Sequence, residues 1–186
     1  MKKIFALIWA TVLSASSFAQ NLVTAGVKEI RAEYAEAQEK VKAMNGGEAE
    51  KNKVVLVKNE NVPGGGPTEL RVEYFFDSDF QWLEDGEMYL SNPKAFLIRV
   101  NNRVGMLPAA TQEYLVDKES GNLRFHFATE PYIDEDLSTK KHETRCYFDQ
   151  SPDGSTRLLR KIEDKQQWDF KPESQPDDNA FPDDCI

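Results

Sequence analysis

Three consecutive glycines in the stretch "NENVPGGGPTEL", Gly64 to Gly66, are the first candidate for chemistry, because glycine-rich loops can bind phosphate. A P-loop continues with Lys and Ser or Thr and then opens a helix whose free N–H groups face the anion. Here Pro67 and Thr68 follow, and the next residues alternate as a strand does. We therefore interpret the stretch as a flexible link between antiparallel strands, and a contact of this loop with a partner stays open.

Metal ligands are the second candidate. His142 and Cys146 are four residues apart, which on a strand separates them by about 13 Å, too far to share one zinc ion. The acidic stretches "DEDLST" (134–139) and "DDNAFPDD" (177–184) offer oxygen ligands without the spacing or the glycine of an EF-hand. No metal and no other cofactor is predicted, and calcium binding by these acidic loops is left open.

Catalytic patterns are also weak. No G-x-S-x-G turn exposes a serine nucleophile. Two carboxylates could serve a glycoside hydrolase, but in a chain with 32 acidic residues some pair is always available. No catalytic residue is therefore predicted.

Charged and aromatic surfaces remain as binding candidates. The polar side of the predicted strands forms a ladder of opposite charges, which is ordinary on a solvated face, although arginines also anchor interfaces. The ladder comprises Arg71, Glu73, Arg99, Glu113, Arg124, His126, Glu143 and Arg145.

The segment 78–93, "SDFQWLEDGEMYLSNP", fits neither the helical nor the strand period and is predicted to be an excursion between strands, with a short helical turn as one option. Its aromatic rings either pack under the sheet edge or bind a sugar or a protein. If a partner binds, we expect it here rather than on the charged face. The predicted binding residues are Phe80, Trp82, Tyr89, Arg71, Arg99 and Arg124.

An amphipathic helix should precede the sheet. Apolar residues recur from Val23 to Met44 at spacings of four and three, and Arg31 lies on the opposite, charged face. The sequence "NGG" at 45–47 is a helix stop. A coiled-coil partner could cover the stripe, but a helix on a sheet is the preferred interpretation.

From Lys53 onward the period is two, as in "ELRVEYFFD" and "NLRFHFA". The first run predicts that Leu70, Val72, Tyr74 and Phe76 are buried, and the second places Leu123, Phe125 and Phe127 inward. Turn sequences such as "DKESGN" and "QSPDGS" predict antiparallel hairpins. About seven strands are expected: 54–58, 69–77, 95–101, 112–117, 122–128, 143–149 and 156–164.

The fold class is therefore α+β, with the N-terminal helix across one face of a twisted antiparallel sheet. This layout resembles that of cystatin-like folds. None of that family's inhibitory motifs occurs, so the resemblance implies an arrangement and no activity.

Residues 1–19 have the parts of a secretory signal: Lys2 and Lys3, an apolar run, and the small residues of "SFA", with cleavage expected before Gln20. Residues 20–170 are predicted to form one domain, and 171–186 an acidic, proline-rich tail. No segment is long enough to span a membrane. The formal net charge of −9, or −11 without the two signal lysines, argues against nucleic acid as a partner.

Export places the two cysteines, Cys146 and Cys185, in an oxidising compartment where they are predicted to bond, which would contribute about 4 kcal/mol. The alternative is Cys146 buried as a thiol and Cys185 free near the end of the chain.

We expect an exported, periplasmic or secreted, non-enzymatic binding module for an envelope protein or glycan. The alternative is a small hydrolase of an envelope glycan or peptide. The pattern does not indicate an oligomeric state.

Overall fold

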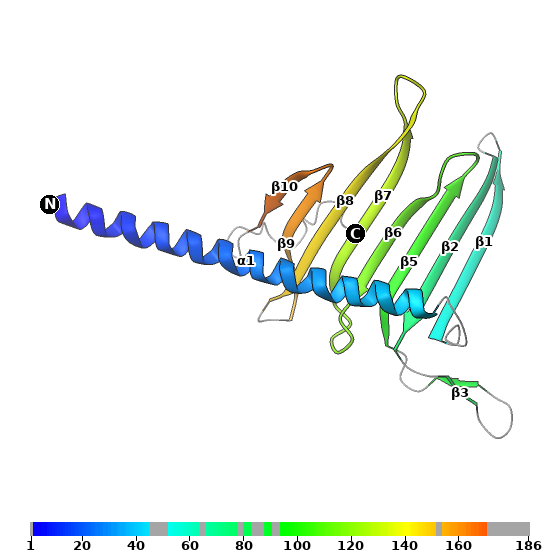
Figure 1. The fold of residues 1–186 in the computed structure, drawn as a ribbon, viewed down its shortest axis with the longest axis horizontal. Helices are drawn as coiled ribbons and strands as arrows, with labels where there is room; N and C mark the ends of the chain where they lie inside the picture. The colour runs from blue at the N-terminus through cyan, green and yellow to red at the C-terminus, as the bar shows by residue number, and fades with distance from the viewer. Residues whose placement is uncertain are drawn as a thin grey trace.

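One long helix lies across an antiparallel sheet in the computed structural model (Figure 1). The structure describes residues 2–44, 52–63, 66–77, 80–82, 88–90, 94–151 and 154–170, and it describes side chains from residue 21 onward except in the short strands at 80–82 and 88–90. The predicted α+β class is confirmed, since within these residues one helix packs on a sheet of eight strands.

The helix α1 (Lys2–Met44) ends where the helix stop was predicted. Its apolar stripe is buried as expected: Val23, Val27, Ile30, Ala37 and Val41 are each 4% exposed or less. All these contacts follow the cleavage site expected before Gln20. In the part of the chain that the structure describes, no helix is both long and apolar enough to cross a membrane.

The main sheet has the order β1-β2-β5-β6-β7-β8-β9-β10, and each strand is antiparallel to its neighbours. All seven predicted strands are present, most of them longer than predicted. The strands are β1 (Lys53–Val62), β2 (Gly66–Phe76), β5 (Ala95–Val104), β6 (Ala110–Val116), β7 (Leu123–Ile133), β8 (Thr139–Gln150), β9 (Thr156–Glu163) and β10 (Gln166–Asp169).

The sequence analysis missed β10, and the turn before it explains why. Asp164 and Lys165 both have positive φ, 42° and 79°, as in a two-residue hairpin turn. Neither residue is the Gly or Asn that normally signals such a turn. In the β6–β7 turn the prediction from glycine is confirmed, because Gly121 has a positive φ of 76°.

The excursion at 78–93 contains two short strands, β3 (Phe80–Trp82) and β4 (Met88–Leu90), which pair with each other outside the main sheet. The predicted binding residues Phe80, Trp82 and Tyr89 lie on these strands. Their side chains are outside the described residues. Whether these rings pack under the sheet or bind a partner therefore stays a prediction.

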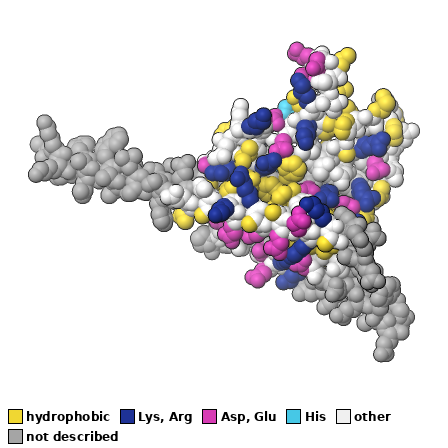
Figure 2. Space-filling view, viewed as in Figure 1, with side chains coloured by type: hydrophobic (Ala, Val, Ile, Leu, Met, Phe, Trp, Pro, Cys, Tyr) yellow, Lys and Arg dark blue, Asp and Glu magenta, His cyan; other side chains and the backbone are white. Residues whose placement is uncertain are grey.

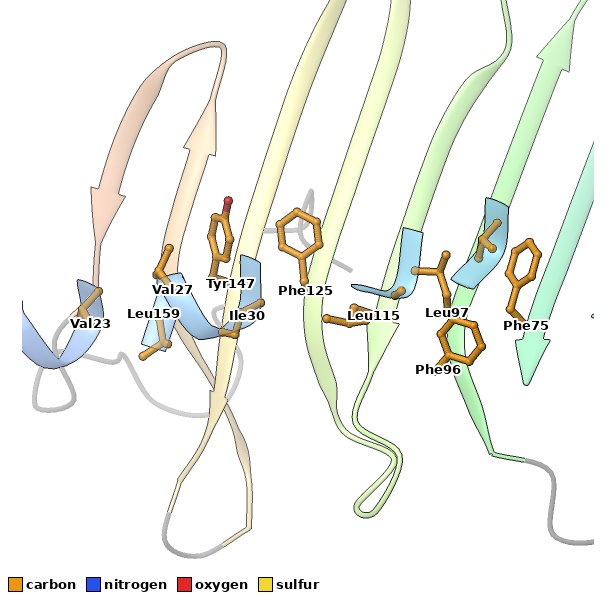
Figure 3. Close-up of a cluster of buried hydrophobic side chains, with 12 residues drawn as sticks. Val23, Val27, Ile30, Phe75, Phe96, Leu97, Leu115, Phe125, Tyr147 and Leu159 are labelled. Atoms are coloured by element: carbon orange, nitrogen blue, oxygen red, sulfur yellow. The ribbon is translucent and has the colours of Figure 1, made fainter. Parts of the chain in front are cut away.

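The core lies between α1 and one half of the helix-facing side of the sheet (Figure 3). Burying an aliphatic or aromatic side chain of this kind contributes about 1.5–3 kcal/mol. At Gly26 an added Cβ would lie 3.1 Å from Leu159 Cδ1, so the helix approaches β9 closely there. The strands contribute Phe75, Phe96, Leu97, Leu115, Phe125, Tyr147 and Leu159 to this core.

The predicted charged ladder does not form one solvated face, because its carboxylates Glu73 and Glu113 are buried and His126 lies on the opposite face, so that expectation is wrong. Glu73 and Glu113 are buried, at 8% and 6% exposed, and they lie on the side that faces the helix. In β2 it is Phe75 that is fully buried, whereas the expected core residues Val72 and Tyr74 are only half-buried on the opposite side. The period of two identifies which residues share a face, but not which face the helix covers.

The far face carries a row formed by Tyr114, His126 and Cys146. His126 is 2% exposed and stacks on the Tyr114 ring, with centroids 4.7 Å apart and planes at 11°. Neither ring nitrogen of His126 has a hydrogen-bond partner, and burial lowers its pKa to about 4. The one charge in line with this row is Lys161, which pairs with Glu163 at 3.1 Å.

Cys146 is fully buried on this far face, beside Phe148 and Leu158. Its predicted partner Cys185 and the tail at 171–186 lie outside the described residues. The disulfide therefore stays a prediction.

His126 should make the folded protein sensitive to acid. Between pH 6.5 and about 4 the unfolded chain binds a proton that the folded protein excludes, so the stability present above pH 6.5 is lost as the pH falls. We expect His126→Phe, which keeps the stacked ring, to unfold no more easily at pH 7. Relative to the wild type it should gain up to about 3 kcal/mol by pH 4. Urea unfolding at a series of pH values measures this.

His142 is the matched control. It is exposed, and its hydrogen bond to Asp164 raises its pKa, so its contribution is present at low pH and lost as the pH rises. His142→Gln should therefore shift the pH dependence in the opposite direction. A His126→Phe variant with the wild-type pH profile would contradict the assignment.

Candidate functional site

A hollow opens where α1 leaves the helix-facing side of the sheet uncovered. It measures about 300 Å³ and is lined by Arg31 and Tyr34 of α1, by Phe125 and Phe127 of β7, and by Arg145 and Tyr147 of β8. Figure 2 shows hydrophobic side chains gathered in the middle of this face of the molecule, with Lys and Arg side chains beside them. The hollow therefore combines an apolar floor with cationic walls.

Packed aromatic rings form the floor. The Phe125 ring lies 4.6 Å from Tyr34 and 4.9 Å from Tyr147, centroid to centroid, at interplanar angles of 56° and 44°. Such tilted arrangements are favourable for aromatic pairs. Phe125 and Tyr147 are buried, whereas Tyr34 and Phe127 are half-buried and keep part of their surface open to the hollow.

The two arginines differ in how their charge is balanced. Arg31 Nε donates a hydrogen bond to Tyr147 Oη at 3.1 Å, and the Arg31 guanidinium lies 5.4 Å from the centre of the Tyr147 ring. Within the described residues Arg31 has no ion pair. Arg145 lies over the Phe127 ring at 5.8 Å and pairs with Glu143 at 2.6 Å. Of the two arginines, Arg31 is therefore the one whose positive charge is not balanced by a carboxylate among the described residues.

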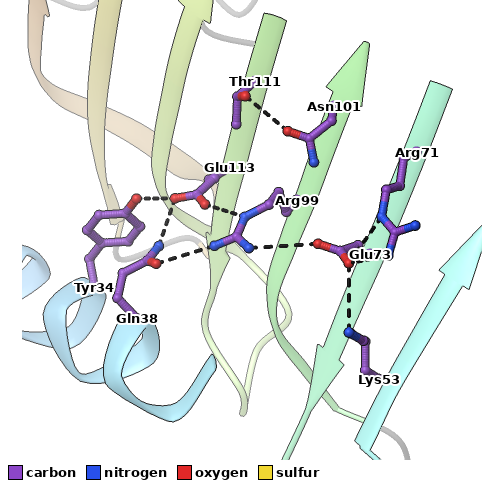
Figure 4. Close-up of polar contacts among 9 residues, drawn as sticks. All are labelled: Tyr34, Gln38, Lys53, Arg71, Glu73, Arg99, Asn101, Thr111 and Glu113. Atoms are coloured by element: carbon purple, nitrogen blue, oxygen red, sulfur yellow. Dashed lines mark hydrogen bonds and ion pairs between the residues drawn. The ribbon is translucent and has the colours of Figure 1, made fainter. Parts of the chain in front are cut away.

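A polar cluster fixes one wall of the hollow (Figure 4). The Glu113 carboxylate accepts hydrogen bonds from Tyr34 Oη, from Gln38 Nε2 at 2.7 Å and from Arg99 Nε at 2.6 Å. Arg99 also donates to Gln38 Oε1 at 3.4 Å. Helix and sheet are thus joined by hydrogen bonds at the boundary between the core and the uncovered face.

The cluster continues along the sheet through Glu73. This carboxylate lies 3.7 Å from Arg99, 3.0 Å from Arg71 and 3.9 Å from Lys53. The buried negative charges at Glu73 and Glu113 are therefore compensated by three cations, as buried charges must be.

Tyr34 is held as a neutral hydrogen-bond donor. Burial, and after it the hydrogen bond to Glu113, raise the pKa of Tyr34 well above its usual range. Its hydroxyl already donates to Glu113, so Tyr34 offers a ligand its ring and no free proton. This arrangement suits a positioning side chain in a binding site.

A second depression lies on the other flank of α1, beside Phe96 and Leu115. Its charges are satisfied locally. Lys40 pairs with Glu36 at 3.0 Å and with Asp77 at 3.7 Å, and Lys118 also pairs with Asp77. It therefore offers a ligand less than the first hollow does. Elsewhere in the described chain, His, Cys, Asp and Glu form no group of three or more that could hold a metal ion.

The predicted arginines Arg71, Arg99 and Arg124 do not line the hollow. Arg71 and Arg99 share the Glu73 carboxylate. Arg124 bonds to Glu33 of the helix at 3.2 Å and to Asp149 at 3.4 Å. These contacts commit the three guanidinium groups to structural pairs, and whether any of them also binds a partner stays a prediction.

Sequence reasoning named some of the residues that line the hollow, Arg145 in the charged ladder and Phe125 and Phe127 on a buried face, but did not bring them together with Arg31 and Tyr34. Arg31 was assigned to the exposed face of the helix and Tyr34 to its apolar stripe. Both descriptions hold locally. Their approach to Arg145 and Tyr147 depends on how the helix crosses strands more than a hundred residues away, for which the sequence pattern contains no signal.

The Glu113 cluster should be a main attachment of the helix to the sheet. We expect Glu113→Gln to lower the free energy of unfolding by about 2–4 kcal/mol, because it removes the anion that three donors share and leaves Arg99 less compensated. Denaturant unfolding measures this. Glu36→Gln, in an exposed pair with Lys40, is the control and should change little. Equal losses in the two variants would contradict the role of the cluster.

Comparisons of the chain with protein-family models, with curated proteins and with solved structures found no match. The functional argument therefore depends on the geometry of the hollow and its polar wall.

Proposed function

We propose that this protein is an exported, non-enzymatic binding module whose site is the hollow between α1, β7 and β8. Its ligand is a small organic anion that combines one carboxylate, phosphate or sulfonate group with an apolar ring or chain. The observation that carries the proposal is Arg31, a cation with no ion pair in the described chain, at the mouth of a hollow floored by aromatic rings.

The size and lining of the hollow support a ligand of this kind. Small-molecule sites are mostly apolar, hold a few placed polar groups and begin at about 300 Å³. The half-buried rings of Tyr34 and Phe127 can contact the apolar part of the ligand. The guanidinium of Arg31 can bind an anionic group through paired N–H donors.

The acidity of the whole protein does not oppose an anionic ligand at this place. The formal net charge is −9, but charges farther away than about 8 Å are largely screened at physiological ionic strength. At the hollow Arg145 pairs with Glu143, and Glu113 in the polar wall pairs with Arg99. Within the described residues the charge of Arg31 is balanced by no carboxylate, so it can attract an anionic group.

A hydrolase is less well supported. Its acid and base would need carboxylates within reach of a substrate. The buried carboxylates on this face, Glu73 and Glu113, are held by Arg71, Arg99, Lys53, Tyr34 and Gln38. A carboxylate held by several donors is poorly available to take up or release a proton.

Three expectations from the sequence belong to this proposal. Export follows from the signal pattern at 1–19. The cystatin-like layout implies an arrangement and contributes nothing to the choice of ligand. An envelope protein or glycan bound at Phe80, Trp82 and Tyr89 is the competing site.

The dye 8-anilino-1-naphthalenesulfonate, an aromatic ring system with one anionic group, tests the proposal. We expect its fluorescence to rise on binding, and Arg31→Ala to weaken binding by about tenfold or more, the effect of losing a charge-assisted hydrogen bond. N-phenyl-1-naphthylamine, which has the rings without the sulfonate, should lose little affinity in that variant. Phe127→Ala should weaken both dyes.

Two variants control this experiment. Arg103→Ala removes an exposed arginine of the same sheet and should leave both affinities unchanged. Trp82→Ala tests the competing site. If Trp82→Ala abolishes dye binding while Arg31→Ala does not, the hollow is not the site. Circular dichroism melting of each variant separates lost binding from lost folding.

A further inference from the structure

The strand β1 forms one edge of the sheet (Figure 1). The side chains at positions 56–62 are all exposed, seven in succession. Leu56, Val57 and Val62 are 56%, 50% and 44% exposed. An open strand edge with apolar side chains is a template for pairing with another strand.

The charges on this edge do not protect it in the usual way. Edge strands commonly carry charges of one sign, so that two edges repel each other. Here Lys58 and Glu60 have opposite signs and lie two residues apart on the same face, at 2.7 Å from each other. Two such strands can therefore attract each other if the register brings unlike charges together.

One register does so. Two copies related by a two-fold axis pair antiparallel, and each residue lies opposite the residue equally far from the axis on the other side. With the axis at Asn59, Lys58 of each copy lies opposite Glu60 of the other. Leu56 then lies opposite Val62, also twice.

Neighbouring registers fit worse. An axis at Lys58 places the two lysines against each other, and an axis at Val57 places Leu56 opposite Lys58. Directly opposed like charges destabilise a pair of strands, whereas opposite charges and apolar pairs each contribute about 0.2–1 kcal/mol. The sequence of β1 thus favours the axis at Asn59.

We propose that β1 binds a second copy of this chain through antiparallel pairing of residues 56–62, with the two-fold axis at Asn59. The sheets of the two copies then continue across the contact. Leu56 and its sheet neighbour Val72 lie on the far face, so the paired copies extend one apolar strip there. The hollow at β7 and β8 stays open, because β2, β5 and β6 separate β1 from those strands.

Variants with reversed charges at Lys58 and Glu60 test the register, and analytical ultracentrifugation measures how strongly each variant dimerises. The wild-type protein should form a dimer, and Lys58→Glu or Glu60→Lys alone should each weaken it at least tenfold by opposing like charges. An equimolar mixture of the two single variants should form a heterodimer, since its opposed charges are again unlike. Lys165→Glu and Glu135→Lys, which make the same charge changes in exposed turns, are the controls and should dimerise as the wild type does.

Cross-linking locates the axis independently. Asn59→Cys should form an intermolecular disulfide under mild oxidation, because paired Cα atoms lie about 4.5–5.5 Å apart. In this register the two copies of Val57 are about 13 Å apart, as are those of Asn61, so Val57→Cys and Asn61→Cys should not cross-link.

Each outcome of these two experiments either supports or overturns the proposed dimer. A wild-type protein that stays monomeric at 100 µM overturns the proposal, and so does a dimer that neither single charge variant weakens. Cross-linking at Val57 or Asn61 in place of Asn59 overturns the register. Recovery of the dimer only in the mixture of variants supports it.

Discussion

The fold depends on the burial of one helical stripe against one half of a sheet. Ile30 and Val27 of the helix are 0% and 1% exposed, and the strand residues beneath the helix are buried to a similar degree. In the described chain no second helix packs on the sheet. Beside the buried residues of the stripe, Tyr34 and Gln38 donate hydrogen bonds to Glu113, so the position of the helix is set by both packing and hydrogen bonds.

Because the helix covers only part of its face, the remainder of that face carries the features that could bind a ligand. Within single strands the helix-facing residues change from apolar beneath the helix to charged beside it, as from Phe75 to Glu73 and from Leu115 to Glu113. The aromatic residues that form the floor of the hollow also belong to the edge of the hydrophobic core. The aromatic rings of a binding site at this place are already fixed in position, because they pack against the core that stabilises the fold.

Much of the architecture could be predicted from local pattern. The helix end at Met44, the apolar stripe and seven of the eight strands in the main sheet follow from periodicity and turn residues. The strand β10 could not be predicted, because its turn at Asp164 and Lys165 uses positive φ without Gly or Asn. The hollow could not be predicted either. Arg31 and Tyr147 meet across 116 residues, and only the path of the helix over the sheet brings them together.

That separation in sequence also bears on how the protein reaches its folded state. Most strands of the sheet pair with a neighbour adjacent in the chain, so the sheet can grow by local hairpins, which form quickly. The helix is made first, yet many of its contacts are with β7, β8 and β9, which are made much later. Part of its apolar stripe therefore stays uncovered until late in synthesis, and exposed apolar surface of this kind is prone to aggregate.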